Sequence, residues 1–120
     1  MKALFDTNIL IDHLNSVSQA REELARYRHK AISIVTWVEV LVGANAEKEA
    51  RTRSFLDQFE IVAFDHAVAE RAVELRRSHA IKLPDAVIWA SAQVHAMLLV
   101  TRNIQDFPAD DPGVRMPYVV

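Results

Sequence analysis

The chain has 120 residues, of which 51% are hydrophobic, so it can bury one core and we expect a single domain over residues 1–120. The absence of cysteine excludes disulfides, thiol catalysis and cysteine-ligated zinc, and a net charge of −2 gives no overall attraction to a nucleic-acid backbone. The charge at residue 6 comes too early for a signal peptide, and no apolar stretch is long enough for a bilayer. We therefore expect a cytoplasmic protein with no membrane association.

Short apolar runs alternate with amphipathic segments along the chain. In order, the pattern predicts a strand over 2–5, helices over 7–14 and 16–29, a strand over 31–35, helices over 36–44 and 47–59, a strand over 61–64, a helix over 65–80, a helix from 84, a strand over 98–101, a turn over 103–107 and a last strand over 114–119. Pro117 places that last strand at an edge. The alternation predicts an α/β fold: a three-layer sandwich with a central, mostly parallel sheet of four to five strands flanked by helices.

Two families of site are excluded by residue type. Only two glycines, Gly43 and Gly113, are present, whereas phosphate-cradling loops and dinucleotide fingerprints need several at fixed spacing. No serine lies in the glycine-flanked context of a nucleophile elbow, and no histidine pair has the spacing of a helical zinc protease. The remaining chemistry rests on acids.

Acids and amides gather where strands are expected to end. Asp6 ends the first strand, Glu39 follows the second within a helical turn, Asp85 opens a helix, and Asn103 and Asp106 follow the strand over 98–101. In open α/β sheets ligands bind beyond the carboxyl ends of the strands. The sequence therefore predicts that these side chains share one site.

Each residue also has a structural interpretation. Thr36 and Glu39 match a capping box, Asp85 lies where a helix dipole stabilises an acid by about 0.3–1 kcal/mol, and Asn103 can cap a short turn. Asp6 is different, because a carboxylate that closes a buried strand loses hydration and needs a compensating partner. It is the residue for which a chemical role is the better interpretation.

Three carboxylates in a small space repel one another, and a divalent cation resolves that conflict. We expect Asp6, Glu39 and Asp85 to hold it, and oxygen ligands favour Mg²⁺, with Mn²⁺ as a substitute, over zinc. Neighbouring polar side chains are expected to orient these acids: Thr7, Asn8, Ser33, Thr36 and Thr101. Lys82 and Arg102 are the cations expected to hold a phosphate backbone near the acids.

Four segments, residues 5–12, 33–39, 83–90 and 99–107, resemble those of PIN-domain ribonucleases, and specifically the VapC toxins of type II toxin–antitoxin pairs. The resemblance spans almost the whole chain, in order. It implies a PIN-like fold and Mg²⁺- or Mn²⁺-dependent endoribonuclease activity, often on structured RNA such as tRNA. It also implies a homodimer that a VapB-like antitoxin inhibits and that contacts DNA only through that antitoxin.

Carried onto this chain, the resemblance assigns the acidic triad to Asp6, Glu39 and Asp85. The family's fourth acid falls at Asn103, an amide, which leaves Asp106 as the substitute. We expect metal-activated water to attack a phosphodiester in line, leaving a 5′-phosphate and a 3′-hydroxyl. Two alternatives stay open: a Mg²⁺-dependent phosphatase, although position 8 is asparagine where a second aspartate is usual, and a non-catalytic RNA- or protein-binding module.

Overall fold

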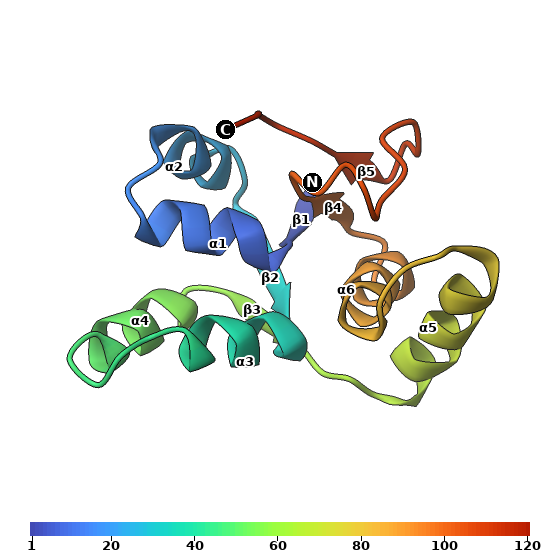
Figure 1. Ribbon diagram of the computed structural model, residues 1–120, viewed down its shortest axis with the longest axis horizontal. Helices are drawn as coiled ribbons and strands as arrows, with labels where there is room; N and C mark the ends of the chain where they lie inside the picture. Colours follow the sequence, from blue (N-terminus) through green and yellow to red (C-terminus); the bar gives the residue numbers. More distant parts are fainter.

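The computed structural model describes residues 1–120 and is built around one five-stranded sheet (Figure 1). Its strands lie in the order β3-β2-β1-β4-β5, and every neighbouring pair is parallel. The strands are β1 (Lys2–Phe5), β2 (His29–Ser33), β3 (Glu60–Val62), β4 (Leu98–Val100) and β5 (Val114–Arg115). The predicted α/β class and the central, mostly parallel sheet of four to five strands are confirmed: the sheet has five strands, all of them parallel, and β5 is an edge strand.

Six helices cover the two faces of the sheet: α1 (Thr7–Leu14), α2 (Ser18–Ala25), α3 (Ile34–Val42), α4 (Glu49–Leu56), α5 (His66–Ser78) and α6 (Leu83–Val94). Successive strand residues point to opposite faces, so Phe5 packs with α1 to α4 while Leu4 packs with α5 and α6. Figure 1 shows these two groups of helices on either side of the strands. None of the helices combines the length and apolar character that crossing a membrane requires.

The junction between β2 and α3 differs from the prediction. The strand begins at His29 and ends at Ser33, and the helix begins at Ile34. The Ser33 hydroxyl accepts a hydrogen bond from the Val35 N–H at 3.0 Å, which caps the helix two residues before the expected start. The predicted capping box between Thr36 and Glu39 is therefore wrong. The β-branched residues that suggested a strand lie in the first turn of α3, because capping and burial outweigh their weak propensity.

Other boundaries also differ from the prediction. Helices α2 and α4 are shorter at both ends than predicted, and β3 begins one residue earlier. The last strand covers only residues 114–115 of the predicted 114–119. Helix α1 begins at Thr7, but its N-cap is Asp6, whose side chain accepts the Thr7 N–H, so the strand-ending acid is also the cap.

Candidate active site

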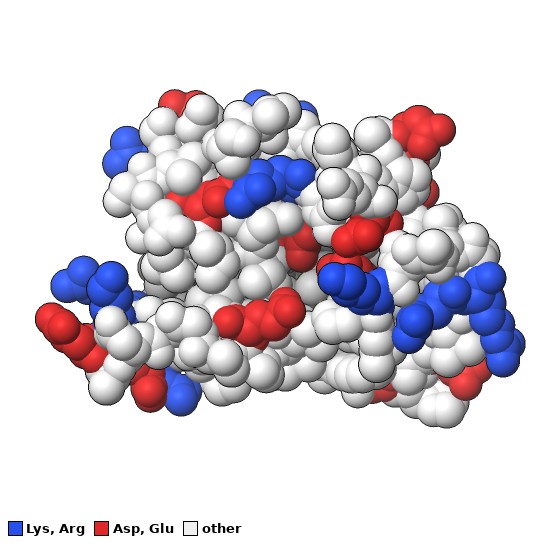
Figure 2. Space-filling view, viewed as in Figure 1, with Lys and Arg blue, Asp and Glu red and all other residues white.

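The carboxyl ends of β2, β1 and β4 lie side by side, so the residues that follow these strands meet at one edge of the sheet. Figure 2 shows acidic side chains around the hollow in the middle of the face that this edge presents, with basic side chains beside them. We call this edge the catalytic rim and define it by Asp6, Glu39, Asp85, Asn103 and Asp106. The sequence predicted this gathering, and the structure brings the acids within electrostatic reach of one another.

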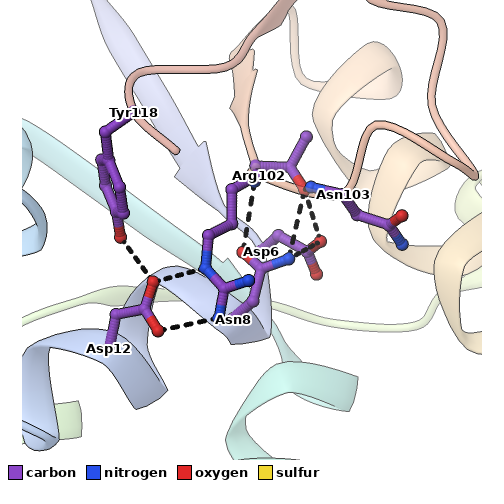
Figure 3. Close-up of polar contacts among 7 residues, drawn as sticks. Asp6, Asn8, Asp12, Arg102, Asn103 and Tyr118 are labelled. Atoms are coloured by element: carbon purple, nitrogen blue, oxygen red, sulfur yellow. Dashed lines mark hydrogen bonds and ion pairs between the residues drawn. The ribbon is translucent and has the colours of Figure 1, made fainter. Parts of the chain in front are cut away.

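Asp6 lies at the centre of the rim and is only 4% exposed. Its Oδ1 accepts the Thr7 N–H at 2.8 Å, and its Oδ2 accepts the Thr101 hydroxyl at 2.7 Å and the Asn8 amide at 3.2 Å (Figure 3). Burial raises the pKa of Asp6; these hydrogen bonds offset that effect in part, and the charges of Glu39 and Asp106 add to it. Three of the five predicted orienting residues thus hold this one carboxylate.

Asp85, in the first turn of α6, faces Asp106 across the rim. Burial, then the charge of Asp6, a hydrogen bond with Asp106 and the charges of Asp106 and Glu39 raise the pKa of Asp85 from 3.8 to about 7. In the metal-free protein the pKa of this carboxyl therefore lies near neutral pH, so Asp85 keeps its proton at mildly acidic pH. A helix-dipole role alone would lower the pKa, so the capping interpretation of Asp85 does not explain its environment.

Glu39 comes from α3 and is the most exposed acid of the rim. The Thr7 hydroxyl lies 2.6 Å from Glu39 Oε1 and 3.0 Å from the Thr36 hydroxyl, which is fully buried. These two threonines fix the carboxylate across the space between α1 and α3. Ser33, in contrast, makes its hydrogen bond to the Val35 N–H and none to an acid, so it caps a helix instead of orienting the site.

The sequence left open whether Asn103 or Asp106 completes the acidic site, and in the structure the two side chains have different roles. The Asn103 side-chain oxygen accepts the backbone N–H groups of Gln105 and Asp106, both at 3.2 Å, which caps the turn. Its amide nitrogen donates to Asp106 Oδ2 at 2.8 Å. The amide is thus occupied with the turn, and Asp106 brings the fourth carboxylate to the rim.

The donors of the rim fit a hard divalent cation. The acids offer only oxygen atoms. Burial raises the pKa values of Asp6 and Asp85, mutual repulsion adds to this, and a cation between the acids would favour their charged forms. No group of three or more Asp, Glu or His side chains is closed tightly enough in the structure to surround an ion as it stands. Binding therefore requires the more exposed carboxylates to close on the cation.

The two predicted phosphate-binding cations lie in different environments. Lys82 is exposed directly before α6. Arg102 instead donates from Nε and Nη2 to Asp12 at 2.5 and 2.9 Å, and the Tyr118 hydroxyl donates to the same carboxylate at 2.8 Å (Figure 3). Because Nε and Nη2 of Arg102 hold this ion pair, Lys82 is the cation that remains unpaired next to Asp85 along the chain.

Sequence reasoning missed Asp12, Tyr118 and a second cluster of the same kind. There, Arg115 donates two hydrogen bonds to Glu23, at 2.7 and 3.0 Å, and Tyr27 donates a third at 2.8 Å. We call these clusters the Asp12 latch and the Glu23 latch. Both tie the segment after β4 to the first two helices. An acid at a helical position that faces the core is the one signal for them, because it requires a partner.

The raised pKa of Asp85 gives the metal-free protein a pH-dependent stability. Above pH 3.8 the unfolded chain releases this proton while the folded chain keeps it until about pH 7, so stability falls as the pH rises through this window. We expect thermal unfolding in EDTA to show a lower Tm at pH 8 than at pH 5, and Asp85→Asn to reduce that difference. Asp110→Asn, an exposed control, should keep it; an equal fall in wild type and Asp85→Asn would contradict the assignment.

The sequence matches the family model of the PIN domain over residues 3–109. The chain belongs to the PIN-domain family. Ribonuclease VapC10 of Mycobacterium tuberculosis is 34% identical over 113 residues, which cover 88% of this PIN domain and 85% of that protein. A chain of a toxin–antitoxin complex from Klebsiella pneumoniae superposes with a TM-score of 0.94 at 47% identity, covering 99% of this chain and 100% of that one.

A chain of VapBC2 from Rickettsia felis, bound to a DNA fragment from its promoter, superposes with a TM-score of 0.73 at 27% identity. That match covers 95% of this PIN domain and 96% of the other chain. These likenesses confirm the resemblance seen in the sequence. The protein is a VapC-like PIN domain, the class that contains the ribonuclease toxins of toxin–antitoxin pairs.

Proposed function

We propose that this PIN domain is a Mg²⁺-dependent endoribonuclease, with Mn²⁺ as a substitute, and that it acts in the cytoplasm as the toxin of a VapBC-type pair. The observation that carries the proposal is the catalytic rim, where four carboxylates from separate segments meet, and where burial together with the neighbouring acids raises the pKa of Asp85 to about 7. Structural caps alone do not account for this concentration of like charge. The similarity to a named ribonuclease and to toxin–antitoxin complexes supports the choice of RNA as substrate.

Asp6, Glu39 and Asp85 would hold the cation, with Asp106 as the fourth acid. When bound, the cation supplies Lewis-acid activation of water and neutralises charge on the phosphodiester. Asp6 is fixed by its three hydrogen bonds and sets the position of the site. Glu39, exposed and held by Thr7, is the carboxylate placed to position the attacking water and accept its proton.

Two further side chains complete the machinery. Asn103 acts as a positioning residue, because its amide holds Asp106 toward the rim. Lys82, exposed at the start of α6, lies on the same side as Asp85 and would neutralise a phosphate of the substrate. In-line attack then gives a 5′-phosphate and a 3′-hydroxyl, on structured RNA such as tRNA.

The proposed partners are a VapB-like antitoxin and a second copy of the chain, with DNA contacted only through the antitoxin. The toxin–antitoxin complexes among the similar structures support the first. Exposed apolar side chains on one face of α3 support the second: Val38 is 47% exposed and Val42 is 79% exposed, one helical turn apart. Such a stripe is typical of a surface covered by another protein.

Expression in bacteria tests the toxin assignment. We expect the chain alone to arrest growth and produce discrete RNA fragments, because a single active nuclease turns over many RNA molecules. Co-expression with the small protein encoded beside its gene should restore growth. Purified protein with Mn²⁺ should cleave RNA and leave small phosphomonoesters intact. Harmless expression with intact RNA would contradict the toxin assignment, whereas turnover of phosphomonoesters would support a phosphatase, and RNA binding without cleavage a non-catalytic module.

A further inference from the structure

A basic groove lies at the edge of the sheet opposite the catalytic rim. Lys2 begins β1 and Lys30 lies near the start of β2; together with Arg28 and Glu60 they line a cavity of about 210 Å³. Because all strands are parallel, this amino edge is separated from the rim by the length of β1, roughly 13 Å for four residues. The groove therefore does not belong to the active site.

Three neighbouring cavities, each of which shares lining residues with the next, make up this groove. The first shares Lys30 and Gln58 with a second cavity, also of about 210 Å³, between α2 and α4. The second shares His13 and Arg21 with a third, of about 350 Å³, at the end of α1. The three cavities are therefore neighbours along one side of the molecule.

The charge of the groove is opposite to that of the whole protein. Its lining contains the cations Lys2, Arg21, Arg28 and Lys30 and a single acid, Glu60, whereas the chain carries a net charge of −2. No carboxylate forms an ion pair with any of these four cations in the structure. Unpaired cations concentrated along a concave surface attract a polyanion.

His13 adds an independent observation. Its ring stacks on Phe55, with centroids 4.8 Å apart and planes 11° from parallel, and lines two of the three cavities. Its Nδ1 is buried and has no hydrogen-bond partner, the one buried side-chain nitrogen or oxygen in the protein of which this is true. A buried polar atom without a partner costs stability, and in this protein that atom belongs to a side chain whose ring lines the groove.

We propose that this basic groove binds the sugar–phosphate backbone of the RNA substrate at a distance from the cleavage site. The proposal rests on the proposed function. The rim itself, with four carboxylates and one exposed lysine, gives little attraction to RNA, so affinity must come from elsewhere on the surface. Apolar residues make up two of the eight that line the first cavity, four of the eight that line the second and one of the five that line the third. Because protein docking relies on apolar anchors, the first and third cavities suit RNA better than an acidic protein segment.

The test measures binding of a labelled stem-loop RNA in EDTA, where no cleavage occurs, over a series of salt concentrations. The double variant Arg21→Gln/Arg28→Gln should bind about tenfold more weakly at 0.1 M salt, and the slope of log K against log salt should fall by about 1.5, since each lost phosphate contact removes about 0.7–0.9. The matched control, Lys48→Gln/Arg51→Gln, removes the same charge from two exposed residues outside the groove, one directly before α4 and one within it. It should bind RNA like the wild type. Unfolding midpoints check that both variants fold.

Three results would overturn the proposal: unchanged binding by the groove variant, equal weakening by the control variant, or an oligoglutamate peptide of matched charge that binds as tightly as the RNA and suffers the same loss. The last result would make the groove a site for acidic polypeptides. Cleavage by the wild type with Mn²⁺ is scored separately. A wild type that binds RNA through the groove but never cleaves it would refute the proposed function and leave the groove intact.

Discussion

Asparagine at position 6 or 85 should reduce RNA cleavage by about a thousandfold or more while leaving the fold unchanged. The amide matches the shape of the carboxylate, and its single oxygen can still accept one of the two hydrogen bonds that Asp6 receives on separate oxygens from Thr7 and Thr101. What each substitution removes is negative charge, which the cation requires. Single-turnover cleavage of RNA with Mn²⁺, together with thermal unfolding, separates the loss of charge from a loss of structure.

Asp110→Asn is the matched control, since it removes the same charge from an exposed loop residue beyond the turn that holds Asp106. It should cleave like the wild type. Asn103→Ala should give an intermediate loss of about 10–100-fold, the usual cost of removing a side chain that orients a ligand. Wild-type rates in Asp6→Asn or Asp85→Asn with metal present would show that the rim is not the catalytic centre.

The location of the rim could be predicted because it follows from the fold. Apolar runs that alternate with helices predict parallel strands, and parallel strands bring the residues after each of them to one edge. Asp6 needed only that argument and approximate boundaries. Asp85 needed one more step, because it opens α6, the helix that leads into β4 and therefore begins at the same edge. Glu39 was predicted on the helix that carries it, although the predicted start of that helix was wrong. Moving the start from Thr36 to Ile34 leaves Glu39 on the same helix.

The details that sequence reasoning could not supply depend on side-chain direction. Both Asn103 and Asp106 lie in one turn, and only the hydrogen bonds of that turn decide that the amide faces the backbone while the acid faces Asp85. Arg102 looked like a ligand for phosphate because its partner, Asp12, lies 90 residues earlier in the chain. Charge pairs between such distant segments leave no periodic signal.

The Glu23 latch should contribute strongly to the free energy of unfolding. Its ion-paired residues, Glu23 and Arg115, should contribute unequally. Glu23 is only 4% exposed, whereas the Arg115 side chain is 34% exposed. Burial by itself would raise the pKa of Glu23, but the hydrogen bonds from Arg115 and Tyr27 outweigh it and keep the carboxylate charged. Arg115→Ala leaves that charge buried and should cost about 3 kcal/mol in the free energy of unfolding. Glu23→Ala should cost less, about 1–2 kcal/mol, because the freed arginine can turn toward water. Urea denaturation measures both.

The Asp12 latch has the same chemistry as the Glu23 latch, but it holds a residue of the segment that forms the rim. Comparing variants of the two latches therefore separates an effect on stability from an effect on catalysis. Arg102 follows Thr101, which binds Asp6, and precedes Asn103, which holds Asp106. Asp12→Ala releases Arg102 and Tyr118, so it should lower both the free energy of unfolding and the rate of cleavage measured well below the Tm. The Arg115 side chain donates its hydrogen bonds to Glu23 and to no residue of the rim, so Arg115→Ala should lower only the first. If the loss in cleavage rate followed the loss in free energy of unfolding equally in both variants, Arg102 would be a structural anchor with no influence on the acids. A larger loss of cleavage in Asp12→Ala would mean that the ion pair sets the geometry of the turn that supplies the fourth carboxylate.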